Sequence, residues 1–133
     1  MTIAVAYTDS DAGRAALVVA VRQAQLEGTT LQVLSVIDDE PDGDDAVQRA
    51  EAEAHVADVL DSLPSLPAWT ARVVAAGGDV AQGLLDLVVE SGATMIVIGS
   101  RRRSPVGKLL MGSVVQRVIL DSPVPVLTVK PAA

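Results

Sequence analysis

The sequence lacks cysteine and phenylalanine, and its aromatic residues are limited to Tyr7 and Trp69. Without cysteine the chain can form no disulfide and carry out no thiolate chemistry, which fits a reducing compartment. Aromatic residues make up 2% of the 133 residues, whereas hydrophobic residues make up 50%, so alanine, valine, leucine and isoleucine must fill the interior. This length suits one domain, residues 1–133, with a buried core.

Long hydrophobic runs are also missing. No apolar stretch approaches the roughly 18 residues that a membrane span requires, and the first residues lack the pattern of a signal peptide. We therefore expect a soluble, cytoplasmic protein. The net charge of −7 and the pI of about 4.4 argue against general binding to nucleic acid or to an anionic membrane.

Acidic residues are absent from one segment, Gly92 to Leu120. This segment carries a local charge of +5, which leaves −12 for the rest of the chain. Its basic residues are Arg101, Arg102, Arg103, Lys108 and Arg117. A basic patch in an acidic protein indicates a site for a small anion, and the alternative is a solvated loop that keeps the protein soluble.

Short apolar, β-branched runs alternate with longer segments of helical periodicity, as repeated βα units require. The runs are nearly continuously apolar, which favours parallel strands covered on both faces and a doubly wound, Rossmann-like α/β sheet. The predicted strands are Ile3 to Thr8, Leu31 to Ile37, Ala71 to Ala75, Met95 to Gly99 and Val124 to Val129.

Helices are predicted between these strands. The first runs from Ser10 or Asp11 to about Glu27 and stops at Gly28, because a small polar residue caps a helix start and glycine ends a helix. The second covers about Asp45 to Leu63, the third contains Val80 to Val88 and ends at Gly92, and the fourth begins near Ser113. The acidic loop from Asp38 to Asp45 is interpreted as a solvated connection, because it lacks the spacing of a calcium loop.

Two loops follow carboxyl ends of strands, where open α/β sheets bind ligands. They are Asp9 to Ala12 after the first strand and Ser100 to Gly112 after the fourth. The second loop is long for so small a domain, which is typical of a binding role or of disorder. It ends at Gly112 and Ser113, where the free N–H groups and the dipole of a helix start can hold a phosphate.

The stretch from Ile96 to Lys130, IVIGSRRRSPVGKLLMGSVVQRVILDSPVPVLTVK, resembles the carboxy-terminal half of universal stress proteins. The resemblance extends over essentially the whole chain and includes Gly78-Asp79 before the third helix. Nucleotide-binding members carry glycine, two residues, glycine, nine residues, glycine, then serine or threonine. Gly99, Gly112 and Ser113 stand at those separations, and together these matches are specific.

This resemblance implies a five-stranded parallel sheet in order 3-2-1-4-5 with helices on both faces. It also implies weak binding of ATP or AMP by ten residues: Thr8, Asp9, Val36, Ile98, Gly99, Arg102, Arg103, Gly112, Ser113 and Val114. Arg102 replaces the second glycine of the pattern, and its side chain could either fill the pocket or pair with a phosphate. Thr8 replaces the usual acidic residue, with Asp9 one position late, so the charge that would help hold a metal is absent.

No catalytic group and no metal site can be assembled from the sequence. His55 stands alone among alanine and valine, and no cluster has metal-ligand spacing. We therefore expect that the protein is not an enzyme. Three hypotheses remain: a nucleotide-responsive regulatory module of the stress response, a ligand-free dimeric scaffold whose pocket Arg102 closes, and a slow ATP hydrolase or phosphotransferase. An apolar edge strand, Val124 to Val129, predicts a homodimer, as is common in the family.

Overall fold

The structure is a computed structural model that describes residues 1–37, 45–75, 78–100 and 112–131. Strands and helices alternate along this part of the chain, as the apolar pattern predicted. The strands are β1 (Thr2–Tyr7), β2 (Thr30–Ile37), β3 (Trp69–Ala75), β4 (Ala93–Gly99) and β5 (Val126–Val129). The helices are α1 (Asp11–Glu27), α2 (Asp45–Leu60), α3 (Val80–Ser91) and α4 (Ser113–Asp121).

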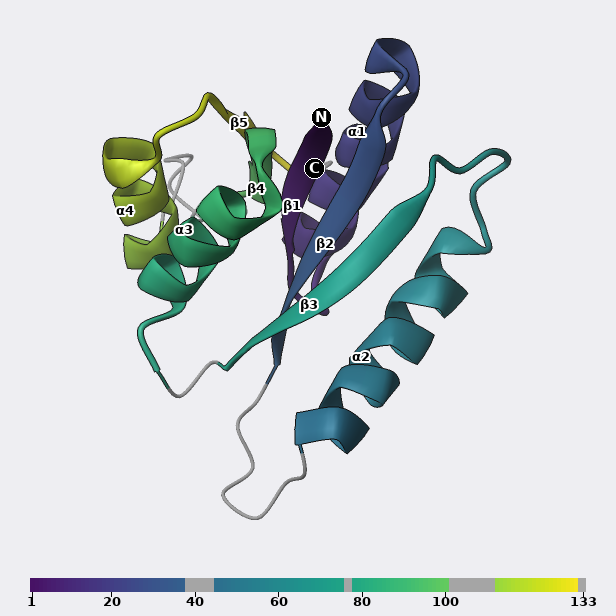
Figure 1. Ribbon diagram of the computed structural model, residues 1–133, viewed down its shortest axis with the longest axis horizontal. Helices are drawn as coiled ribbons and strands as arrows, with labels where there is room; N and C mark the ends of the chain where they lie inside the picture. Colours follow the sequence, from purple (N-terminus) through teal and green to yellow (C-terminus); the bar gives the residue numbers. More distant parts are fainter. Residues whose placement is uncertain (38–44, 76–77, 101–111, 132–133) are drawn as a thin grey trace, which may run out of the picture.

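The strands form one parallel sheet in the order β3-β2-β1-β4-β5, which confirms the predicted topology. Helices α1 and α2 cover one face of the sheet, and α3 and α4 cover the other (Figure 1). All six residues of β1, at the centre of the sheet, are buried. The strand order reverses between β1 and β4, and the carboxyl ends of these two strands therefore open a crevice between neighbouring loops.

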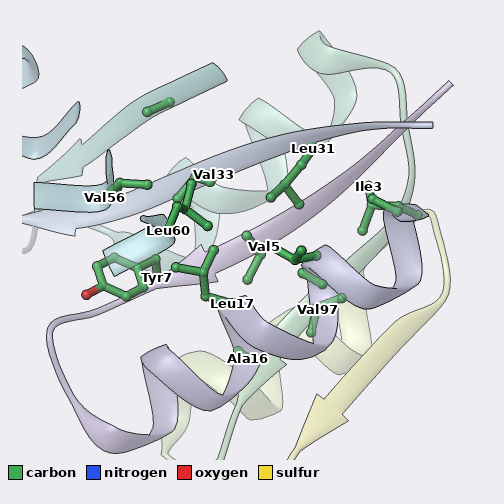
Figure 2. Packing of buried hydrophobic residues seen from close by; sticks show 14 residues of the cluster. Ile3, Val5, Tyr7, Ala16, Leu17, Leu31, Val33, Val56, Leu60 and Val97 are labelled. Atoms are coloured by element: carbon green, nitrogen blue, oxygen red, sulfur yellow. The ribbon is translucent and has the colours of Figure 1, made fainter. Parts of the chain in front are cut away.

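Each face of the sheet has its own aliphatic core, because alternate side chains of a strand point to opposite faces. Val5 and Val33 face α1 and α2, where they pack in a cluster with Tyr7, Leu17 and Val56 (Figure 2). A second cluster on the other face is held mainly by short and branched side chains: Ala4, Leu34, Leu84, Ile96 and Val118. The expected interior of alanine, valine, leucine and isoleucine is confirmed.

The ends of α1 and α3 are set by the residues that the sequence indicated. Gly28 and Gly92 adopt left-handed φ angles of 62° and 66°, and each ends its helix there. This conformation costs glycine little because it has no Cβ. At the start of α1, the Ser10 hydroxyl accepts a hydrogen bond from the Gly13 N–H at 3.1 Å.

Helix α2 and strand β5 are both shorter than predicted. Helix α2 ends at Leu60 instead of Leu63, because the chain then tightens into a turn in which the Leu63 N–H donates to the Leu60 carbonyl. Strand β5 begins at Val126 instead of Val124, because the Ser122 hydroxyl holds the Val124 backbone in a local turn.

The other strands also differ from their predicted bounds. They begin earlier, since pairing continues into polar and bulky residues beyond the apolar runs, as Trp69 does with Leu31. Strand β1 ends at Tyr7 because the next carbonyl, that of Thr8, accepts the Ser10 N–H in a tight turn. The acidic loop predicted as a solvated connection lies outside the described residues except for Asp45.

Candidate functional site

A pocket of about 530 Å³ opens at the carboxyl ends of β1 and β4, on the side of the sheet that α3 and α4 cover. Predicted nucleotide contacts line it: Thr8, Val36, Ile98, Gly99, Gly112, Ser113 and Val114. Its volume lies within the usual range for small-molecule sites, and most of its lining is aliphatic with a few hydroxyl and backbone groups. The crevice predicted from the topology is therefore present and holds these residues together.

The start of α4 forms one polar wall of this pocket. Gly112 is the N-cap residue, with an extended backbone (φ −68°, ψ 161°), and as a glycine it has no side chain to cap the helix. The first helical hydrogen bond is donated by the Gln116 N–H to the Gly112 carbonyl at 3.1 Å, so the N–H groups before it have no helical acceptor. Ser113 is exposed beside them. This arrangement offers backbone donors, a hydroxyl and the positive end of the helix dipole to an anion.

The start of α1 forms the opposite wall, and the protein's own side chains already occupy its hydrogen-bond donors and complement its dipole. Thr8 and Ser10 hydroxyls lie 2.7 Å apart, and Ser10 also caps the helix. Asp11 in the first turn accepts a hydrogen bond from Arg14 at 3.0 Å, and this bond is the main reason why the pKa of Arg14 is raised. The helix dipole is thus already complemented by negative charge at this wall.

Two glycines permit the close packing of the start of α1 against the ends of β1 and β4. A methyl carbon built at Gly13 would lie 1.9 Å from the Thr8 carbonyl oxygen, and one built at Gly99 would lie 2.3 Å from the Ala12 carbonyl oxygen. Both distances are far below a van der Waals contact. The sequence predicted that Gly99 allows the close approach of a ligand, and in the structure it also lets the end of β4 pack against the start of α1.

Asp9, a predicted nucleotide contact, lies outside this pocket. It lines a second hollow of about 600 Å³ on the α2 side of the sheet, together with Tyr7, Ser35 and His55. Arg14 donates to the Asp9 carboxylate at 2.9 Å. Asp9 is therefore turned toward α1 and α2, on the opposite face from the glycine-lined pocket.

The same hollow contains a polar pair that the sequence did not indicate. The Tyr7 hydroxyl and Nε2 of His55 lie 2.8 Å apart, although the residues are separated by 48 positions. Burial raises the pKa of Tyr7, and the nearby charge of Asp9 adds to the rise. The Ser35 hydroxyl is buried with no hydrogen-bond partner in the part of the chain that is described. His55 thus has a hydrogen-bonding role between α2 and β1.

Several residues that line the main pocket were not among the ten predicted contacts: Ala6, Ser10, Asp11, Ala12, Gly13, Val80, Leu84, Val115 and Pro131. Ser10, Asp11 and Ala12 belong to the loop after the first strand that the sequence predicted as a ligand loop, and Gly13 follows it directly. Val80 and Leu84 reach the pocket only through the packing of α3, which a linear pattern does not reveal. Arg102 and Arg103, the remaining predicted contacts, lie outside the described residues.

Two features of the described residues bear on function. They contain no group of three or more His, Cys, Asp or Glu side chains placed to hold a metal ion. Within the same residues, none of the helices combines the length and the apolar character that crossing a bilayer would need.

Comparison with known proteins assigns the chain to a family. The model of the universal stress protein family matches residues 1–130, and the chain belongs to this family. It is 36% identical over 133 residues to a universal stress protein of Mycolicibacterium smegmatis, with 97% of both chains covered. The resemblance found in the carboxy-terminal half is therefore confirmed.

Solved structures support the same assignment. A universal stress protein from Archaeoglobus fulgidus matches with a TM-score of 0.76 and 28% identity, covering 96% of this chain and 97% of that one. Another structure from that organism, a universal stress protein in complex with dAMP, matches with a TM-score of 0.69 and 23% identity over 96% of both chains. The latter likeness shows the fold alone.

Proposed function

We propose that this protein is a nucleotide-responsive regulatory module whose ligand is ATP or a related adenine nucleotide. The observation that carries the proposal is the pocket of about 530 Å³, into which the uncapped start of α4 presents Gly112 and Ser113. A phosphate would accept hydrogen bonds from the first N–H groups of α4 and from the Ser113 hydroxyl. The aliphatic lining, including Val36, Val80 and Ile98, would cover the base.

The relative bound to dAMP guides the choice of ligand, since it has the same fold and holds an adenine nucleotide. The proposal that this chain binds a nucleotide is supported by the chain's own pocket. Hydrolysis is not part of the proposal. Among the described residues that line the pocket, the single carboxylate, Asp11, is engaged by Arg14, and no His or Lys side chain accompanies it. Binding would act by changing the surface that the loop after β4 shows to partners.

Calorimetric titration with ATP, ADP and AMP tests the proposal. We expect weak binding that decreases with salt, because phosphate contacts are largely electrostatic. Ser113→Ala should weaken it about tenfold, since a hydrogen bond to a charged group is lost. No detectable heat with any of the three nucleotides, in the wild type or in Arg102→Gly, would reject nucleotide binding and favour the ligand-free scaffold.

Arg102 stands where the family pattern has its second glycine, and its side chain could either support or prevent nucleotide binding. If its guanidinium pairs with a phosphate, Arg102→Ala should lower the affinity about ten- to a hundredfold. If its side chain closes the pocket, Arg102→Gly should create or strengthen binding. Titration of the two variants gives changes of opposite sign and therefore separates these hypotheses.

We further propose a cytoplasmic homodimer formed through β5. This strand is the edge of the sheet beyond β4, and all four of its residues are only partly buried. An apolar edge with unpaired backbone groups favours pairing with a second copy. Sedimentation should show a dimer at micromolar concentration, whereas a monomer at that concentration and above would contradict the proposal.

A further inference from the structure

Arg117 on α4 is bound to the first turn of α3. Its Nη1 donates to both carboxylate oxygens of Asp79, at 2.7 and 2.6 Å, and its Nη2 donates to Oε1 of Gln82 at 2.9 Å. Nε also lies 3.5 Å from the Asp121 carboxylate, one turn along the same helix. The sequence placed Arg117 in the predicted basic patch for an anion, whereas in the structure its guanidinium pairs with Asp79 between two helices.

Asp79 has two roles at this contact. It is the N-cap of α3, where its Oδ1 accepts the Gln82 N–H at 3.1 Å, and it is the acceptor for Arg117. The hydrogen bond from Arg117 is the main cause of the lowered pKa of Asp79, and the bond raises the pKa of Arg117 in return. The contact therefore joins the capped first turn of α3 directly to α4.

The contact lies next to the pocket without lining it. Val80 and Leu84 from α3 form one part of the lining, and Ser113 to Val115 from α4 form another. Neither Asp79 nor Arg117 is among the lining residues. Arg117 stands four residues after Ser113, on the same side of α4. The bridge thus connects the two helices whose first turns shape the site.

Helix α4 needs such support. It is nine residues long, and its buried residues are Val115 and Val118. An isolated helix of this length is not stable in water, so its position depends on tertiary contacts. A clamp from Arg117 to the start of α3 limits how far the amino end of α4 can move relative to the rest of the pocket.

We infer that Arg117 is a positioning residue, which holds the anion-binding start of α4 in place through Asp79. The inference rests on the proposed nucleotide site and adds a means by which its affinity is set. The competing mechanism is that a phosphate draws Arg117 away from Asp79 and binds it directly. In that case Asp79 would oppose binding, whereas in ours it supports binding.

Two neutral variants distinguish the mechanisms. Arg117→Gln removes the cation, and Asp79→Asn removes the acceptor charge while keeping a residue that caps helices well. Positioning predicts that each variant weakens ATP binding about two- to fivefold, as suits a partly exposed ion pair, and that the double variant is no weaker than the single ones. Stronger binding by Asp79→Asn would overturn the inference.

Arg72→Gln is the matched control. Arg72 on β3 forms an ion pair with Glu90 at 3.4 Å, so it also ties α3 to a neighbouring element. Neither of these residues lines the pocket. The control variant should leave ATP affinity unchanged. A loss equal to that of Arg117→Gln would mean that any ion pair on α3 has the same effect, and would overturn the specific role of Arg117.

Amide hydrogen exchange without nucleotide provides a second readout. Arg117→Gln and Asp79→Asn should each increase exchange in α4, with exchange in α1 unchanged. Unchanged exchange in α4 would contradict the positioning role even if the wild type binds no nucleotide. Failure of the wild type to bind ATP, ADP or AMP would instead reject the proposed function, so the two failures are distinct.

Discussion

Helices α1 and α4 begin at opposite walls of the same pocket, and their first turns differ. Ser10 caps α1 through the Gly13 N–H, and Asp11 adds an acidic residue to its first turn. The start of α4 has as its N-cap Gly112, which carries no side chain to cap the helix, and its first turn has no acidic residue. One helix start is therefore satisfied within the protein, and the other offers its donors to a ligand.

This difference assigns the two walls separate roles. A capped helix start with nearby negative charge stabilises the fold and repels an anion. An uncapped start binds an anion at little cost in stability, because no internal hydrogen bond must first be broken. Changes at the start of α1 should therefore act mainly on folding, and changes at the start of α4 mainly on binding.

The largest effect on stability is expected at Gly13. In Gly13→Ala the new methyl group would meet the Thr8 carbonyl, and the free energy of unfolding should fall by about 3 kcal/mol, at the upper end for overpacking. Gly78→Ala is the control, because the nearest atom to its methyl carbon is 3.8 Å away. Urea denaturation of both variants measures the difference, and equal stability would refute the close packing of this wall.

A smaller loss is expected when the cap of α1 is removed. Ser10→Ala deletes the acceptor for the Gly13 N–H, and such substitutions cost about 1 kcal/mol. Thermal and urea unfolding should both report this loss. If the variant kept its stability, the conclusion that the Ser10 side chain stabilises the start of α1 would be wrong.

The smallest expected effect is on the stability at acidic pH. Because Arg117 lowers the pKa of Asp79 in the folded state, the pair contributes stability above the ordinary carboxyl pKa of 3.8 and loses it as the pH falls below that value. Both side chains are about half exposed, so the contribution is small. Arg117→Gln should make stability slightly less dependent on pH below about 4. An identical pH profile for the wild type and this variant would refute the ion pair.

Local patterns in the sequence predicted most of the fold. Apolar runs identified the strands, and Gly28 and Gly92 marked helix ends where left-handed backbone is needed. The strand boundaries shifted because pairing with a neighbour, as between Trp69 and Leu31, extends a strand beyond its apolar run. Such pairing depends on the partner, which a local pattern does not contain.

The candidate site was predicted only in part, because a local pattern does not contain the distant partners of a residue. Spacing within one segment placed Gly99, Gly112 and Ser113 around the pocket. Arg117 was assigned to an anion because its partner, Asp79, is 38 residues away in the sequence. Asp9 was placed near the ligand, but its strand end directs it to Arg14 on the other side. Residues that act through distant partners need the folded structure.

The most direct test is the ATP affinity of a variant in which α4, like α1, begins with a capping side chain. Gly112 has an extended backbone that other residues adopt, so Gly112→Asp can cap α4 with a carboxylate. We predict unchanged or slightly higher stability and an ATP affinity about a hundredfold lower, because the carboxylate takes the donors and repels the phosphate. Gly112→Asn, which caps without charge, should fall between this variant and the wild type. An unchanged ATP affinity in Gly112→Asp would contradict the assignment of the anion site to the start of α4.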